Sequence, residues 1–183
     1  MDNELFIKGD SVYLRPVNEN DLSGNYMRWL NDKEVTRFMV FGDSPITLES
    51  MKEYLNTLKN DNSLLLAVIM ADDDRHIGNI RIGPIDEHSN RSDTGIMIGD
   101  RSVWGKGIAS SAMRLALNYS FNGLNLRRIT LGVMSENVKA MKLFESLGFV
   151  REGCLRAHLL CNGIYQDVLL YGLMAEEYKE RNS

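Results

Sequence analysis

The sequence predicts a single domain of the α/β (α+β) class over residues 1–183, with a mixed, mostly antiparallel sheet and helices on both faces. Three observations support this. Apolar runs of strand length alternate with segments of helical period. Short turns join several of these strands as hairpins, which makes them antiparallel. One strand, glycine turn, helix and strand follow each other around Gly105, and such a unit is a right-handed crossover between parallel strands.

The first third of the chain predicts one strand and two helices. Val12–Pro16 has strand character and stops at a proline. Asn18 is a suitable N-cap for a helix that runs to about Leu30. A short segment at residues 34–39 and a loop at residues 42–45 follow. Thr47 can cap a second helix, whose apolar side chains share one face: Leu48, Met51, Tyr54, Leu55 and Leu58.

The middle of the chain predicts three further strands. Leu64–Met70 is a short continuous apolar run, which is typical of a buried strand. After an aspartate-rich turn, residues 76–83 return as a second strand that Pro84 closes. Residues 85–92 form a polar loop. Residues 93–99 form the strand that leads into the glycine turn.

The last part of the chain completes the expected set of seven strands. The helix after the glycine turn stops at Asn122-Gly123. A strand at residues 128–133 precedes a helix that Asn137 opens and Gly148 ends. Two strands at residues 153–160 and 165–173 form a hairpin around Asn162-Gly163, because Asn-Gly is a strong hairpin signal. The charged tail from Glu176 is expected to fray.

Composition excludes several classes of function. A net charge of −4 gives no electrostatic case for nucleic acid. No apolar run reaches membrane-spanning length, and the acidic start at residues 1–4 lacks a signal-peptide core, so a cytoplasmic protein is expected. Cys154 and Cys161 have no metal-binding or redox spacing. The aspartates at 72–74 lack the alternating ligands of a calcium loop, so no metal is expected.

The glycine turn is the stretch with the clearest chemistry. Gly105 and Gly107 let backbone N–H groups approach a ligand closely. The helix that follows directs its unpaired N–H groups and the positive end of its dipole at the same place. Such a turn can hold a phosphate or pyrophosphate without a charged side chain.

Three alternatives compete for this turn. A Walker A loop fails, because the spacer from Gly99 is one residue too long and Gly107 follows Lys106. A dinucleotide-binding fingerprint is disfavoured, because Ser110 stands in place of its third glycine and hairpin strands come first. An ordinary tight turn without a ligand is as good an explanation as long as the motif is considered alone.

The surroundings of the turn resemble the GNAT superfamily of acyl-CoA N-acyltransferases over nearly the whole chain. The superfamily signature Q/R-x-x-G-x-G/A falls on Trp104, Gly107 and Ala109, and Trp104 departs from it. The downstream stretch from Asn137 to Leu147-Gly148-Phe149 is also typical. Within the superfamily, Leu14-Arg15-Pro16, Glu152-Gly153 and Asn162-Gly163 resemble the RimJ/RimL-like branch. The segment from Trp29 to Met39 looks most like its amino-sugar members.

The resemblance implies a GNAT fold whose seven-stranded sheet splays between strands four and five, with acetyl-CoA as co-substrate in the split. The pantetheine arm would extend the exposed strand edge, and Asn137 and Phe144 would contact it. A backbone N–H near Met97 or Ile98 would stabilise the developing oxyanion. The cofactor residues at the turn would be Trp104, Gly105, Lys106, Gly107, Ile108, Ala109 and Ser110.

The catalytic base and acid are less certain from the residues. Asp93 lies where many relatives carry Glu, and a solvated loop aspartate is an equal alternative. His158 and His88 are further candidates, because the reference pKa of histidine is about 6.5. Many relatives place a tyrosine acid where Phe144 stands. Since a thiolate is a tolerable leaving group, that loss need not abolish transfer.

The sequence therefore predicts an N-acetyltransferase that acts on the primary amine of a small molecule, either a nucleotide-linked amino-sugar or a polyamine. The candidate acceptor contacts are Arg37, Phe38, Met39 and Tyr165, and a place in the core is the alternative for Phe38 and Met39. A protein N-terminal acetyltransferase and a non-catalytic acyl-CoA-binding module are the alternatives. The resemblance also favours a homodimer. The acceptor and the general base and acid stay open.

Overall fold

The structure is a computed structural model that describes residues 6–39, 45–161 and 163–182. Three expectations fall partly or wholly outside this range: the acidic start at residues 1–4, most of the loop at residues 42–45, and Asn162 of the expected Asn-Gly turn. In the described part of the chain, no helix combines the length and apolar character needed to span a membrane.

The strands form one mixed sheet in the order β1-β2-β3-β4-β5-β6-β8-β7. All neighbouring pairs are antiparallel except β5 and β6, which are parallel and joined through a helix as predicted. The strands are β1 (Ile7–Lys8), β2 (Val12–Pro16), β3 (Leu64–Met70), β4 (His76–Asp86), β5 (Arg91–Ile98), β6 (Arg128–Met134), β7 (Val150–Cys161) and β8 (Ile164–Met174).

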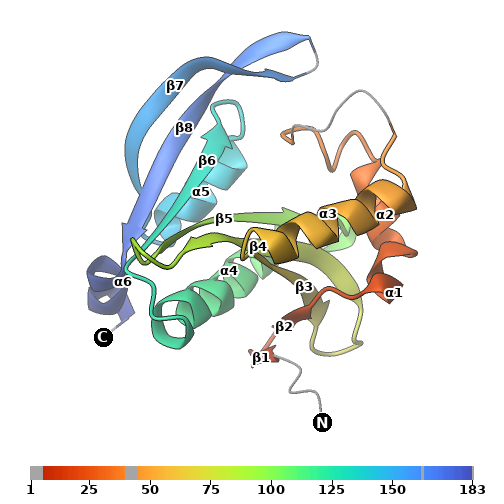
Figure 1. Cartoon of the computed structure of the whole chain (residues 1–183), viewed down its shortest axis with the longest axis horizontal. Helices are drawn as coiled ribbons and strands as arrows, with labels where there is room; N and C mark the ends of the chain where they lie inside the picture. Colours follow the sequence, from red (N-terminus) through yellow and green to blue (C-terminus); the bar gives the residue numbers. More distant parts are fainter. Residues whose placement is uncertain (1–5, 40–44, 162, 183) are drawn as a thin grey trace.

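Helices cover both faces of the sheet (Figure 1), which confirms the predicted fold class. The helical elements are α1 (Glu19–Leu22), α2 (Asn25–Leu30), α3 (Leu48–Asn60), η1 (Arg101–Val103), α4 (Ile108–Asn118), η2 (Tyr119–Gly123), α5 (Val138–Ser146) and α6 (Ala175–Asn182). The first three pack around a small apolar cluster that includes Tyr26, Trp29 and Met97. The larger core, with Met113 and Phe144, lies with α4 and α5.

The sheet splits between β5 and β6, as the resemblance implied. Only Arg91, Ser92 and Asp93 of β5 pair with β6, opposite Arg128 to Thr130. Beyond that point β5 keeps its pairing with β4, and β6 keeps its pairing with β8 as far as Met134. The two halves of the sheet therefore separate toward the carboxyl ends of β5 and β6.

The number and limits of the strands differ from the prediction. The sheet has eight strands and not seven, because β1 is only two residues long and too short to show an alternating pattern. Residues 85–92 are not a loop throughout. β4 continues past Pro84 to Asp86 and β5 starts at Arg91. A register shift between Ile82 and Ile85 accommodates the proline, which cannot donate to the ladder.

Two helix predictions also need correction. The helix expected from Asn18 to Leu30 is two helices, because Ser23 and Gly24 interrupt it, although Asn18 does cap α1. The tail from Glu176 does not fray but forms α6, where Tyr178 stacks on Phe121 with ring centroids 4.9 Å apart. This buried aromatic, with Ala175 packed against the core and Glu177 bonded to Met174 N, anchors a segment whose sequence is mostly charged.

Candidate active site

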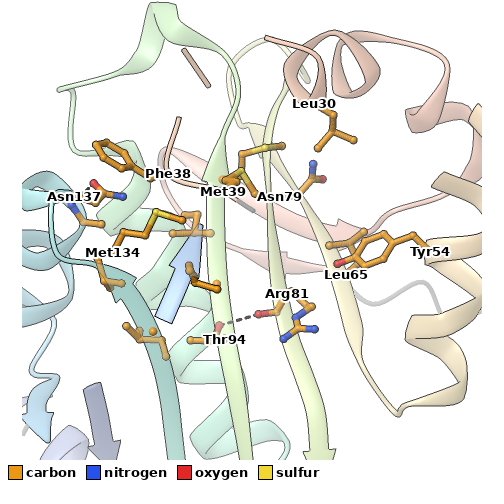
Figure 2. A pocket seen from close by; sticks show the side chains of 18 of the residues that line it. Leu30, Phe38, Met39, Tyr54, Leu65, Asn79, Arg81, Thr94, Met134 and Asn137 are labelled. Carbon is orange, nitrogen blue, oxygen red and sulfur yellow. Dashed lines mark hydrogen bonds between the residues drawn. The ribbon is translucent and has the colours of Figure 1, made fainter. Parts of the chain in front are cut away.

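A cleft of about 550 Å³ lies at the split in the sheet (Figure 2). One side of its lining comes from β6 and α5, and the other side comes from β3, β4, α2 and α3. The exposed edge of β5 lies between them and contributes Thr94 to Met97. Leu159 of β7 and Phe38, Met39 and Ile46 complete the wall.

The glycine turn follows β5 at the end of the sheet where the split opens. Gly105 and Gly107 both have positive φ, at +74° and +78°, which explains why glycine stands at both positions. A Cβ atom on either glycine would meet no other atom within 4 Å, so their outer faces are open. The N-cap of α4 is Gly107, which offers no side chain to the first-turn N–H groups.

Trp104 has a structural role in this turn. Its indole Nε1 donates a hydrogen bond of 2.8 Å to the carbonyl oxygen of Ile98, the last residue of β5. Arg101 lies over its ring at 5.8 Å from the centroid. The residue that departs from the superfamily signature therefore ties the turn to the strand beside the cleft. Lys106, Ile108, Ala109 and Ser110 line the outside of the same turn without entering the cleft wall.

The backbone of β5 distinguishes the two candidate oxyanion donors. Gly99 N donates to Ile77 O, so the backbone groups of Gly99 face β4. Backbone direction alternates along a strand, so Met97 also faces β4 and Ile98 faces the split. The bond from Trp104 to Ile98 O agrees with that direction. The N–H of Ile98 thus points into the split, whereas Met97 lines the cleft with its side chain.

Asn137 and Phe144 line the cleft from α5. Asn137 is the N-cap of this helix, because its Oδ1 accepts from Ala140 N at 3.2 Å. Phe144 is buried and meets Phe149 edge-on at 5.6 Å between centroids. No hydroxyl is available at this position, so an acid for the leaving thiolate has to come from elsewhere.

Asp93 lies on β5 at the point where its pairing with β6 ends. Arg81 Nη2 is 3.5 Å from Asp93 Oδ1, and Thr130 Oγ1 is 3.4 Å from Oδ2. Burial raises the pKa of the Asp93 carboxyl, and the neighbouring Arg81 opposes that rise. Asp93 does not itself line the cleft, but its neighbours Arg81 and Thr94 do.

Four other predicted residues lie away from the cleft wall. His88 is exposed in the turn between β4 and β5, and His158 is exposed on β7 at a register shift. Tyr165 is 68% exposed near the tip of the β7–β8 hairpin, which extends beyond the other strands (Figure 1). The side chain of Arg37 stacks on Phe38, and its carbonyl faces Cys161 Sγ. By contrast, Phe38 and Met39 both line the cleft.

Several polar residues in the cleft were not predicted from the sequence. Asn79 and Arg81 come from β4, and Tyr54 and Ser50 come from α3. Tyr26 of α2 also contributes, and burial raises the pKa of its hydroxyl. The alternation of β4 marks Asn79 and Arg81 as polar residues on one face, and that was the only available signal. Among the described residues, no three His, Cys, Asp or Glu side chains gather to hold a metal ion.

Residues 11–150 match the family model described as the acetyltransferase (GNAT) domain. The N-acetyltransferase p20 of Bacillus licheniformis is 35% identical over 174 residues, which cover 92% of this chain and 96% of the relative. The spermidine N(1)-acetyltransferase of Vibrio cholerae is 31% identical over 169 residues, which cover 92% of this chain and 96% of that protein.

A solved structure of a spermidine acetyltransferase is also similar to this chain in its fold. The crystal structure of spermidine N-acetyltransferase from Vibrio cholerae in complex with CoA and spermine has a TM-score of 0.84 to this chain. The two are 29% identical, and the match covers 93% of this chain and 99% of that one.

Proposed function

Because the chain belongs to the GNAT acetyltransferase family and is an acetyl-CoA-dependent N-acetyltransferase, we propose that it acetylates the primary amine of a small molecule. The observation that carries this proposal is the cleft of about 550 Å³ at the split in the sheet. Its wall combines a free strand edge on one side with side chains of α2, α3 and β4 on the other. One half suits the cofactor and the other suits the acceptor.

The residues of the split fit acetyl-CoA. The amides after Gly107, at the N-terminus of α4, can hold the pyrophosphate, because no side chain caps them and the outer face of the turn is open. The free edge of β5 beyond Asp93 can pair with the amide-bearing pantetheine arm. Asn137, Phe144 and Met97 would line the path of that arm.

The chemistry needs few groups from the chain. Acetyl-CoA supplies an activated thioester, and transfer replaces its C–S bond by a C–N bond and releases one proton from the amine. The N–H of Ile98 is the donor that faces the split and can stabilise negative charge on the acetyl oxygen. Asp93 is the proposed proton acceptor, through water, because its carboxyl does not reach the cleft wall.

The shape of the acceptor half supports a small molecule over a protein N-terminus. Phe38, Met39 and Ile46 contribute apolar side chains to its lining, and so does Leu159 of the long hairpin. A peptide acceptor would need an open groove. The spermidine acetyltransferase relatives make a polyamine one candidate, and the amino-sugar resemblance makes a nucleotide-linked amino-sugar another. The non-catalytic alternative is set aside by family membership.

Release of free CoA over a panel of amines tests this proposal. The panel contains amino-sugars, polyamines and peptides with free N-termini, each with acetyl-CoA in excess. We expect release with a small amine and none with peptides. Release confined to peptides would favour the protein N-terminal alternative. The cytoplasmic location and the homodimer stay predictions, and light scattering of the purified protein tests the latter.

A further inference from the structure

The acceptor half of the cleft has an unusual charge for a site that would take a polyamine. Among the described residues that line the cleft, none is an aspartate or glutamate, and Arg81 is the one fully charged side chain. A polyamine carries several positive charges, which would face Arg81 in the cleft wall, while the nearby carboxylate of Asp93 lies outside that wall. A negatively charged group of the acceptor would be favoured beside Arg81.

Arg81 is placed to meet a ligand. Its side chain is 32% exposed, and it lies beside Tyr54 of α3 in the cleft (Figure 2). Among the described residues, its ion-pair partner is Asp93, whose Oδ1 lies 3.5 Å from Nη2, well beyond the roughly 2.8 Å of a good charge-assisted hydrogen bond. The guanidinium carries five N–H donors, so this long contact occupies only part of its capacity.

The residue opposite Arg81 leaves room for a ligand. Arg81 pairs across the sheet with Gly95 of β5, which also lines the cleft. A Cβ atom at Gly95 would meet no other atom within 4 Å. The space over β5 beside the guanidinium is therefore open, and a group of the acceptor can reach it from the side of the acetyl donor.

Asn79 adds a second donor on the same face of β4, two residues from Arg81. Asn79 is only 4% exposed, and it lines the cleft. Its Nδ2 has no hydrogen-bond partner within the part of the chain that the structure describes. Buried N–H groups normally find an acceptor, and an accepting atom of a ligand in the cleft could supply one here.

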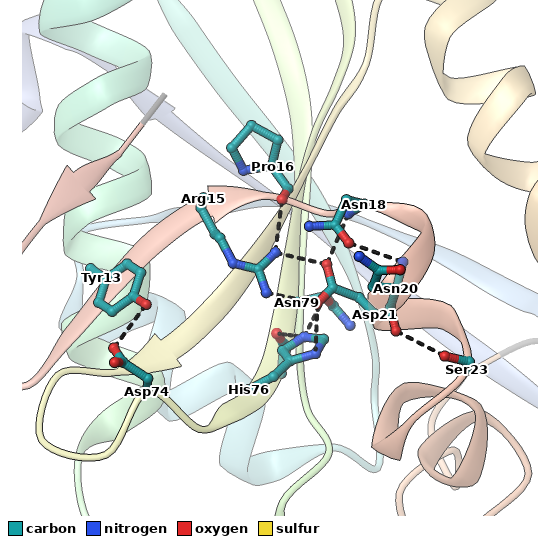
Figure 3. Close-up of polar contacts among 11 residues, drawn as sticks. Tyr13, Arg15, Pro16, Asn18, Asn20, Asp21, Ser23, Asp74, His76 and Asn79 are labelled. Carbon is teal, nitrogen blue, oxygen red and sulfur yellow. Dashed lines mark hydrogen bonds and ion pairs between the residues drawn. The ribbon is translucent and has the colours of Figure 1, made fainter. Parts of the chain in front are cut away.

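The neighbours of Asn79 determine which end of its amide is bonded to His76 (Figure 3). His76 Nε2 lies 3.0 Å from both Gly78 O and Asn79 Oδ1. A carbonyl oxygen only accepts, so Nε2 carries the proton and the Asn79 atom beside it has to be the oxygen. The amide nitrogen is then the end directed away from His76. An ammonium group cannot accept from it, whereas a carboxylate or phosphate oxygen can.

We infer that Arg81 and Asn79 form a subsite for an anionic group of the acceptor, so that the substrate is an amine that also carries a carboxylate or a phosphate. This inference rests on the proposed function, since it places the anion on the same small amine. Successive residues on one face of a strand are about 7 Å apart, so the two donors can hold different oxygens of one substrate.

Matched pairs of amines test the subsite by titration calorimetry into the protein saturated with CoA. The pairs are β-alanine with propylamine, and phosphoethanolamine with ethanolamine, and spermidine is added as a polycation. We expect the anionic member of at least one pair to bind about tenfold to a hundredfold more tightly. The pair that shows the preference tells a carboxylate from a phosphate.

Three substitutions make the test specific. Arg81→Gln should remove the preference and leave the binding of the neutral member unchanged. Arg91→Gln is the matched control, because Arg91 bonds Asp86 on the neighbouring strand and lies outside the cleft wall. Arg81→Lys keeps the positive charge but loses the planar guanidinium with its paired donors, so it should retain part of the preference. It also provides the test if Arg81→Gln does not fold.

The result that would overturn the subsite is equal binding within both pairs, no detectable binding of any member, tighter binding of spermidine, or a preference that survives Arg81→Gln. Release of CoA is measured in a separate assay, with the same amines and variants and with acetyl-CoA in place of CoA, so the two proposals can fail separately. An anion preference without CoA release contradicts only the proposed function. Release of CoA without an anion preference contradicts only the subsite.

Discussion

The two halves of the cleft are built in different ways. The proposed cofactor half consists mostly of backbone: the free edge of β5 in the cleft and, beyond the cleft wall, two glycines with positive φ and the uncapped start of α4. The acceptor half consists of side chains from segments far apart in the sequence, including Tyr26, Tyr54, Asn79 and Arg81. A backbone site needs a fixed local spacing of residues. A side-chain site can change its ligand without changing the fold, which is why the first half identifies the donor and the second selects the amine.

Gly107→Trp should give the largest effect, and it should act on the cofactor half alone. The indole would occupy the open space outside the turn, and the loss of about two charge-assisted hydrogen bonds, roughly 4 kcal/mol, should weaken acetyl-CoA binding about a thousandfold. Calorimetry with acetyl-CoA measures this. Gly163→Trp is the control, because Gly163 has the same positive φ and open surroundings at the hairpin tip, away from the cleft. Equal losses in both variants would contradict a specific site at Gly107.

Asp93→Asn should act on turnover more than on binding. Removal of a general base typically lowers kcat by about a hundredfold. Because burial raises the pKa of Asp93, the wild-type rate should fall as the pH drops through a value above 3.8. If the variant keeps the wild-type rate and the wild-type fall in rate at low pH, Asp93 is not the base.

The same raised pKa has a consequence for stability. The folded state holds the Asp93 proton more tightly than the unfolded chain does, so ionisation of this carboxyl lowers stability as the pH rises through that window. Asp93→Asn should therefore unfold at an equal or higher temperature than the wild type at pH 7, with any gain lost at low pH. Thermal melts at both pH values measure this, and a lower melting temperature at pH 7 would contradict it.

Asn79→Leu should affect only the acceptor half. Leucine has a shape similar to that of asparagine but lacks the amide. The KM for the amine should therefore rise about tenfold, while the Kd of acetyl-CoA stays the same. Asn56→Leu on the exposed side of α3 is the control. A change in acetyl-CoA affinity would show that the two halves are not separate at β4.

Trp104→Phe should give the smallest effect. Phe keeps an apolar ring but loses the hydrogen bond to Ile98 O, which is worth about 1 kcal/mol. We expect the Kd of acetyl-CoA to rise about fivefold. An unchanged Kd would mean that the indole N–H does not hold the turn in its binding conformation.

The sequence predicted the two halves unequally, for physical reasons. The glycine turn, the N-cap Asn137 and the crossover between β5 and β6 are local patterns, so the fold and the cofactor half followed from spacing and resemblance. Arg81 and Asn79 look like ordinary polar strand residues until the sheet pairs them with β5 and α3 covers them. The same limit applies to β1, which is defined by pairing and not by pattern, and to α6, which is held by tertiary contacts such as the stacking of Tyr178 on Phe121.

The separation of the two halves is tested most directly by titrating acetyl-CoA into the wild-type protein and into Arg81→Gln. We predict saturable binding of one acetyl-CoA per chain, with Kd values that agree within about a factor of two, because distant sites contribute independently. No binding to the wild type would contradict the cofactor site. Loss of binding in a folded Arg81→Gln variant would contradict the division of the cleft into a donor half and an acceptor half.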